Sequence, residues 1–325
     1  MVSPQAFVHQ ALIYSSQEEF VSAAVQFIQA GLARDEPVLV VTDPDKAAVL
    51  SDALGNASER VSFEDRANWY QAPARRLSEL YRLFRDQPED GPSRIRVIGE
   101  PVWSGRSDAQ INEWKRFESL VNVACAPFPV VALCPYDAQA LPPSILADAY
   151  RTHPELVSGS KSEPNPEFVD PRAFIRELDE GQELGEPETA AAQLSFHGDL
   201  AELRRFVAGQ ASRAGVGRKK SAELEWAANE TATNVLRHGG GEGTVRTWSG
   251  SGEFICEIVD RGPGINDPLA GQLPPDPDGE LGPGLWLVHQ LCDLVRVRTS
   301  TSGSTVRLHT LLDEAGQTDT ATWSS

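Results

Sequence analysis

Residues 226–241 read WAANETATNVLRHGGG, a small-residue segment with helical character that ends in three glycines. Glu230 and Asn234 lie one helical turn apart, so their side chains project from the same face of the predicted helix. An amide oxygen is a ligand that Mg²⁺ accepts, and a carboxylate one turn away can orient or deprotonate an attacking nucleophile. A polar helix face in water has the same spacing, so the interpretation depends on the segments that follow.

A second signal lies where the predicted strand FICEIVD runs into DRGPG at residues 260–264. Asp260 ends the strand, and a carboxylate there can accept a hydrogen bond from the exocyclic amine of adenine. Gly262 and Gly264 allow the backbone to turn tightly and to approach a ligand closely. An ordinary turn has the same pattern, so the interpretation depends on where this segment lies in the chain relative to the other signals.

The third signal is GPGL at residues 282–285, which places Gly282 and Gly284 before a predicted helix. The free backbone amides and the positive dipole end of such a helix attract anions. From residue 191 onward, predicted helices alternate with antiparallel hairpins, which indicates an α+β two-layer sandwich. Three signals in this order, within one such domain, together favour a nucleotide site.

The segments NETATN, DRGPG and GPGL resemble the nucleotide-binding boxes of the gyrase and histidine-kinase ATPase superfamily over residues 191–312. LRRFVAGQASRAGV, NETATNVLRHGGG and GSTVRLH are most similar to the anti-sigma-factor serine kinases. The resemblance implies a Bergerat-type ATPase fold, ATP and Mg²⁺ as cofactors, and protein serine/threonine kinase activity. It also implies two partners, a sigma factor and an anti-anti-sigma antagonist protein.

The resemblance further implies roles for individual residues. Glu230 becomes the general base, Asn234 the Mg²⁺ ligand and Asp260 the adenine-reading residue. The remaining ATP-binding residues that it implies are Arg237 as a phosphate contact, His238 as a base-stacking side chain, Thr305 facing the adenine, and Gly262, Gly264, Gly282, Gly284 and Leu285 around the pocket and lid.

One departure from the family pattern is Pro283, which lies between the two glycines of the third segment and cannot donate a backbone hydrogen bond. The loop before it is acidic and short of cations. We therefore expect nucleotide binding more readily than efficient turnover, and a non-catalytic binding switch stays open beside a kinase. A histidine kinase is disfavoured, because neither His153 nor His197 lies in a suitable acceptor helix.

The first half of the chain alternates short β-branched runs with helical stretches, which predicts βα units around a mostly parallel sheet. HQALIYSSQEEF, RVIGEPVWSGRS, EWKRFESLVNVA, CPYDAQALP and RTHPEL resemble the MEDS sensory domain of some bacterial and archaeal regulators. The resemblance implies an α/β core of the RecA-like kind. The G-x-x-x-x-G-K-[ST] phosphate loop is absent from the sequence, which favours a ligand or partner sensor over a second ATPase.

Open α/β sheets bind ligands at the carboxyl ends of their strands, which gives a set of candidate sensing residues. An alternative is that Trp103 and Tyr136 belong to the core and that Glu100 and Arg106 form a structural ion pair. The candidates are His9, Tyr14, Glu100, Trp103, Arg106, Tyr136 and Asp137.

These patterns predict a sensory domain at residues 1–171, a linker at 172–190 and an ATPase domain at 191–325. The net charge of −18 disfavours direct contact with nucleic acid or anionic membranes. The four cysteines are widely spaced, without the paired pattern of a structural zinc site, and we expect reduced, buried thiols. Neither a secretory signal nor a bilayer-spanning run stands out, so we expect a cytoplasmic protein, for which a homodimer remains open.

Overall fold

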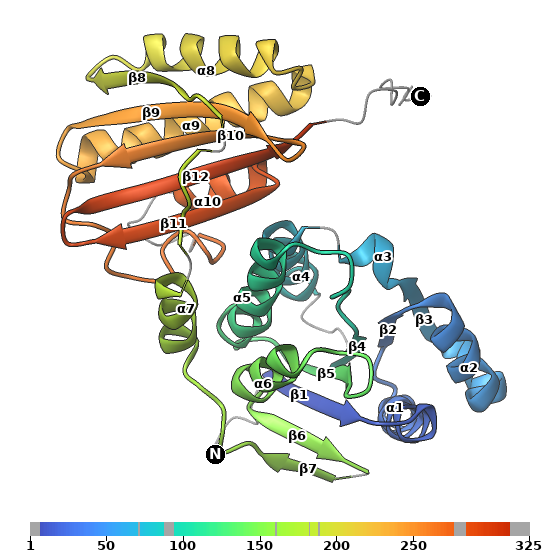
Figure 1. Cartoon of the computed structure of the whole chain (residues 1–325). Helices are drawn as coiled ribbons and strands as arrows, with labels where there is room; N and C mark the ends of the chain where they lie inside the picture. The colour runs from blue at the N-terminus through green and yellow to red at the C-terminus, as the bar shows by residue number, and fades with distance from the viewer. Residues whose placement is uncertain are drawn as a thin grey trace. The chain divides into compact units, whose positions relative to one another are not determined.

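The computed structural model describes residues 7–70, 72–87, 94–159, 161–181, 183–187, 189–275 and 284–312. The chain divides between Leu178 and Asp179 into two units, each with its own sheet (Figure 1). Among the helices of these described residues, none is both long enough and apolar enough to cross a membrane.

The first unit is built on a seven-stranded sheet with the order β3-β2-β4-β5-β1-β6-β7. Neighbouring strands are parallel from β3 to β6, and β7 pairs antiparallel with β6. This confirms the predicted α/β class with a mostly parallel sheet. The strands are β1 (Phe7–Tyr14), β2 (Val38–Thr42), β3 (Val61–Asp65), β4 (Ile95–Gly99), β5 (Val130–Asp137), β6 (Glu155–Ser158) and β7 (Lys161–Pro164).

Several helices of the first unit begin at a capping side chain. Ser16 accepts a hydrogen bond from the Glu19 amide at the start of one helix, and Ser107 forms a capping box with Gln110 at the start of another. The helices are α1 (Gln17–Leu32), α2 (Pro44–Leu54), α3 (Arg66–Trp69), α4 (Pro73–Arg85), α5 (Asp108–Ala124), α6 (Pro143–Thr152) and α7 (Pro171–Glu180), with a 3₁₀ helix η1 at Gly55–Arg60.

Side chains of β1 alternate between the two faces of the first sheet. Leu12 and Tyr14 pack with α1 and α2 in one hydrophobic cluster. His9 points to the other face, where it shares a cavity lining with residues of α4 and α5. In the parallel register His9 pairs with Ala132 of β5, so Cys134, two residues further on, projects to the same face as His9.

The second unit has a five-stranded antiparallel sheet with the order β11-β12-β10-β9-β8. Its helices cover one face, as Figure 1 shows, and pack with the sheet in one core. This confirms the predicted class of an antiparallel sheet with helices. The elements are β8 (Ala192–His197), α8 (Ala201–Arg213), α9 (Arg218–His238), β9 (Glu242–Gly250), β10 (Glu253–Asp260), α10 (Gly284–Leu291), β11 (Leu294–Ser300) and β12 (Gly303–Leu311).

The other face of the second sheet carries a buried ion cluster. Glu257 is fully buried and accepts hydrogen bonds from Arg246 of β9 and Arg307 of β12. Arg307 also donates to the backbone carbonyl of Gly185, and Thr189 donates to that of Ser249. Part of the segment that we expect to be a linker therefore lies along this face of the second unit, while its first residues belong to α7.

Candidate functional site

Helix α9 presents the first pair of predicted site residues. Its small apolar residues, including Ala227, Ala228 and Ala232, are buried against the sheet and allow the helix to pack closely on it. Glu230 and Asn234 fall beside this buried face and are only partly buried. The helix thus holds a carboxylate and an amide one turn apart, at the edge of the core.

The first residue of α10 lies against this pair. A Cβ atom added to Gly284 would be 3.1 Å from Oε2 of Glu230 and 3.8 Å from Oδ1 of Asn234. Two segments that are far apart in the sequence therefore meet at one place. The start of α10 therefore lies against the two oxygen-bearing side chains. Gly282 and Pro283, the other predicted residues of this segment, lie outside the described residues.

Asp260 lies at the other end of α9. Its Oδ1 atom accepts hydrogen bonds from the amide of Gly262 at 2.7 Å and from the amide of Ser304 at 3.3 Å. Gly239, which follows the last residue of α9, is so close that an added Cβ would lie 2.9 Å from the carboxylate carbon of Asp260. Because a helix rises 1.5 Å per residue, Glu230 and Gly239 are about 13 Å apart along the axis, and the group of residues is elongated.

The glycines of DRGPG make contacts within the protein itself. A Cβ on Gly262 would lie 2.5 Å from the Cα of Gly239, and one on Gly264 would lie 2.2 Å from the carbonyl oxygen of Ser300. Gly264 also has a positive φ of 79°. These glycines are therefore required for close packing of the turn on α9 and β11, in addition to the ligand approach that we expect from the sequence.

Thr305 does not join this group, which corrects one prediction. The register pairs Thr305 with Val259, so its side chain lies on the face of Glu257, opposite to that of Asp260. Ser304 lies on the Asp260 face instead, is buried, and donates its amide to that carboxylate. Sequence analysis does not single out Ser304, which lies one position before Thr305.

The remaining predicted residues that the structure describes in this unit are Arg237, His238 and Leu285. Arg237 and His238 are exposed at the end of α9, and the interactions described by the structure do not connect them to Glu230, Asn234 or Asp260. Leu285 packs against the core of the second unit.

Five of the seven predicted sensory residues of the first unit fall into two groups. At the carboxyl ends of the strands, Glu100 accepts hydrogen bonds from Thr42 at 2.6 Å and from Lys46, and Arg66 lies 3.0 Å from its carboxylate. Lys46 also donates to the Tyr14 hydroxyl at 2.8 Å. Burial lowers the pKa of Lys46, but its hydrogen bonds to Glu100 and Tyr14 outweigh this and raise the pKa overall.

Arg106 and Asp137 have local structural partners. Arg106 donates to the backbone carbonyls of Val102 and Tyr70, so the alternative of an ion pair between Arg106 and Glu100 does not form. Asp137 accepts from the amides of Gln139 and Ala140 in the turn after β5. These contacts give both side chains a local structural role and do not indicate that either binds a ligand.

The second group is aromatic and buried. The rings of Trp103 and Tyr136 are 6.2 Å apart, and Tyr136 packs edge-on against His153. The indole Nε1 of Trp103 and the hydroxyl of Tyr136 are both buried without a hydrogen-bond partner within the described residues. Both residues are buried in the core, in agreement with the alternative that they are core residues.

His9 lies next to this aromatic group, with its ring 4.0 Å from that of His153. Glu118 and Cys134 complete a buried cluster with the two histidines. Burial lowers the pKa of His9 to about 4 and that of His153 to about 3, and it raises the pKa of Glu118 to about 7. Of these four residues, sequence analysis singles out only His9 as a candidate sensing residue.

Two family models match the chain. The MEDS model, the methanogen/methylotroph DcmR sensory domain, matches residues 8–154. The model of the histidine kinase-like ATPase domain matches residues 196–310. The chain thus carries a MEDS domain followed by a histidine kinase-like ATPase domain, as both resemblances imply. This combination is that of a signalling regulator.

Solved structures give weaker likenesses. The RsbU and RsbW domains of Rv1364c from Mycobacterium tuberculosis are 18% identical over 38% of this chain, with a TM-score of 0.29, and the match spans 32% of that protein's chain. The histidine kinase domain of the E. coli osmosensor EnvZ is 18% identical over 44% of this chain and 99% of its own, with a TM-score of 0.25. No relative was found among curated proteins.

Proposed function

We propose that the chain is a cytoplasmic signalling regulator whose second unit binds ATP with Mg²⁺ and acts on a protein partner under control of the MEDS unit. The observation that carries this proposal is the meeting of Gly284 with Glu230 and Asn234, which brings a helix start to a carboxylate and an amide. The match of residues 196–310 to the histidine kinase-like ATPase domain supports it.

The residues present fit an ATP·Mg²⁺ complex by their chemistry. The amide oxygen of Asn234 is a hard, neutral ligand for Mg²⁺, which takes its other ligands from phosphates and water. The backbone amides at the start of α10 suit phosphate oxygens. When bound, the nucleotide would supply the phosphoryl group, and Glu230 would accept the proton of an attacking hydroxyl.

Asp260 is suited to recognise adenine. Its hydrogen bonds within the described residues use Oδ1, so Oδ2 keeps its lone pairs for the exocyclic amine of the base. The two amides that hold Oδ1 fix the orientation of the carboxylate. Ser304 extends this end of the site, with its hydroxyl 3.3 Å from that of Thr299.

The partners that we propose are a sigma factor and an anti-anti-sigma antagonist, as the resemblance to anti-sigma-factor serine kinases implies. We also propose that the first unit has a RecA-like core, which the position of β1 between β5 and β6 supports. A small-molecule ligand for this unit is part of the proposal, and the match to the MEDS sensory domain supports it.

Calorimetric titration of the full chain with ATP and Mg²⁺ tests the nucleotide site. Asp260→Asn exchanges an acceptor oxygen for a donor, so the amine of adenine loses a charge-assisted hydrogen bond. We expect affinity to fall by about 1.5–3 kcal/mol, or roughly ten- to a hundredfold. The matched control is Asp199→Asn, since the exposed Asp199 also accepts a backbone amide bond, from Ala201 at 2.8 Å. Equal affinities for both variants would contradict the assignment.

A second candidate function is a non-catalytic switch, in which ATP occupancy alters partner affinity without phosphoryl transfer. Pro283 favours it, because this residue removes a backbone donor from the loop before α10. Incubation of the protein with radiolabelled ATP and co-purified partners separates the two functions. Label on a partner supports the kinase, and ATP-dependent binding without label supports the switch.

A further inference from the structure

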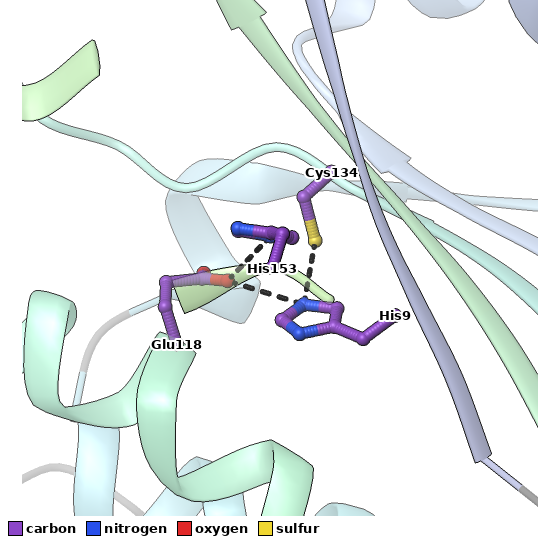
Figure 2. Close-up of side chains that lie close together, drawn as sticks. All are labelled: His9, Glu118, Cys134 and His153. Atoms are coloured by element: carbon purple, nitrogen blue, oxygen red, sulfur yellow. Dashed lines mark hydrogen bonds and ion pairs between the residues drawn. The ribbon is translucent and has the colours of Figure 1, made fainter. Parts of the chain in front are cut away.

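Four polar side chains from four separate segments meet in the core of the first unit (Figure 2). They are His9 of β1, Glu118 of α5, Cys134 of β5 and His153, which follows α6. Nε2 of His9 and Nε2 of His153 each lie 3.5 Å from Oε2 of Glu118, and Sγ of Cys134 lies 3.3 Å from Nε2 of His9. All four donor atoms lie within 4.8 Å of one another, and every residue is at most 6% exposed.

Asn122 fixes which nitrogen of His9 carries the hydrogen. Its Nδ2 atom donates to the backbone carbonyls of Glu118, Ser119 and Thr152, at 3.2, 3.2 and 2.8 Å. Because carbonyls only accept, the oxygen of this amide must be the atom that faces Nδ1 of His9 at 3.1 Å. Nδ1 of His9 is therefore the donor, and Nε2 turns a lone pair toward the cluster.

The backbone fixes the second histidine in the same way. Nδ1 of His153 lies 2.8 Å from the carbonyl oxygen of Ala149, to which it donates. Nε2 of His153 again carries the lone pair, and this atom is buried without a hydrogen-bond partner in the described part of the chain. Two imidazole lone pairs thus converge on one carboxylate oxygen, an arrangement of acceptors that a cation at its centre would satisfy.

We propose that His9, Glu118, Cys134 and His153 bind one divalent transition metal ion, for which Zn²⁺ is the best match. Two imidazoles, a thiolate and a carboxylate are ligands of tetrahedral zinc. Zinc–ligand bonds of about 2.0–2.3 Å give tetrahedral edges of about 3.3–3.6 Å. Three of the six separations in the cluster, at 3.3, 3.5 and 3.5 Å, agree with these edges, and all six lie within 4.8 Å.

Charge balance favours a dication in this position. The thiolate of Cys134 and the carboxylate of Glu118 carry two negative charges, and both imidazoles bind in the neutral form. A divalent ion therefore gives a neutral centre, which avoids the cost of a buried net charge. The hydrogen bonds from Nδ1 of His9 and of His153 are the outer contacts that orient metal-binding imidazoles in proteins.

A cavity of about 50 Å³ adjoins the cluster and is lined by three of the four donors, His9, Glu118 and Cys134. Most of its other lining is apolar or aromatic, from residues such as Phe84 and Phe117. An apolar wall excludes water and strengthens the electrostatic bond between the ion and its ligands. The ion would therefore lie at the wall of an apolar cavity in the sensory unit.

The test uses the full-length chain, purified under reducing conditions. We expect elemental analysis to find about one zinc per chain, as one four-ligand site requires. Co²⁺ added after chelator treatment should give the visible bands of four-coordinate cobalt and a near-ultraviolet thiolate-to-cobalt charge-transfer band. Wild-type protein that retains no metal and gives no charge-transfer band with Co²⁺ would overturn the proposal, whatever the behaviour of any variant.

Two cysteine variants locate the site. Cys134→Ser should abolish the charge-transfer band. Cys125→Ser is the matched control, because Cys125 is buried in the same unit and lines the same cavity but lies outside the group of four. We expect this control to keep the band. Loss of the band in the control alone, or in both variants to the same extent, would contradict the assignment. None of these readouts depends on ATP binding.

Discussion

The polar groups of the two units differ in how they are enclosed. The cluster of His9, Glu118, Cys134 and His153 is buried on all sides and each ring is held by an outer hydrogen bond. The group around Glu230 is partly exposed at the edge between a sheet and its helices. Enclosure suits a ligand that stays bound, such as a metal ion, whereas an open edge suits a nucleotide that must exchange. Because of this difference in enclosure, we expect substitutions in the two groups to have different effects.

If the open group performs phosphoryl transfer, its chemistry can be removed without loss of ATP binding. Glu230→Gln keeps the shape of the side chain but removes the base, so we expect transfer to a partner to fall by about 100- to 10,000-fold while calorimetry shows unchanged ATP affinity. Glu225→Gln, on the same helix, is the control and should keep both properties. An equal loss of binding and transfer in Glu230→Gln would indicate a structural role for this carboxylate.

The packing of DRGPG predicts a large effect on stability. Gly264→Ala places a methyl group 2.2 Å from the carbonyl oxygen of Ser300, in a backbone with positive φ. Gly252→Ala is the matched control, because Gly252 has a φ of 80° but open space around it. We expect the control to lower the free energy of unfolding by about 1–2 kcal/mol.

The Gly264→Ala variant should lose more than that control, about 3–4 kcal/mol, since the clash adds to the backbone strain. Urea unfolding, followed by circular dichroism, measures both variants. Equal losses would mean that the turn can move away from Ser300, and the close packing would then be dispensable.

For the enclosed cluster, we expect the loss of an outer hydrogen bond to have a smaller effect, which would be seen in metal affinity. Asn122→Ala removes the oxygen that holds Nδ1 of His9, so we expect metal affinity to fall by about 10- to 100-fold in a chelator competition assay. Asn112→Ala, also on α5, is the control. Affinities that do not differ between Asn122→Ala and Asn112→Ala would argue against a metal-binding role for His9.

The members of the open group could be proposed from the sequence because each lies in a short local motif. Glu230 and Asn234 follow from helical spacing, and Asp260 from its place at the end of a strand. Ser304 was missed because strand faces alternate at every residue, so an error of one position moves a side chain to the other face. The register of β10 with β12 assigns Thr305 and Ser304 to opposite faces of the sheet.

The enclosed cluster was not predictable as a group, since its four donors come from four segments and lack the paired spacing of a local zinc motif. The sequence does contain one signal. Glu118 lies four residues after Trp114 and three before Val121, so it falls on the apolar face of its helix. A charge at such a position requires a partner, and this would have drawn attention to Glu118.

The central claim is that Asn234 binds Mg²⁺ together with ATP, and a calorimetric comparison tests it most directly. ATP is titrated into wild type, Asn234→Ala and Asn229→Ala, each with Mg²⁺ and with a chelator. Asn229 is the matched control, because it lies on the same helix but accepts a hydrogen bond from Arg204 of α8 at 2.9 Å. We predict that Mg²⁺ strengthens ATP binding in wild type and in Asn229→Ala but not in Asn234→Ala. The same Mg²⁺ dependence in all three proteins would contradict the account.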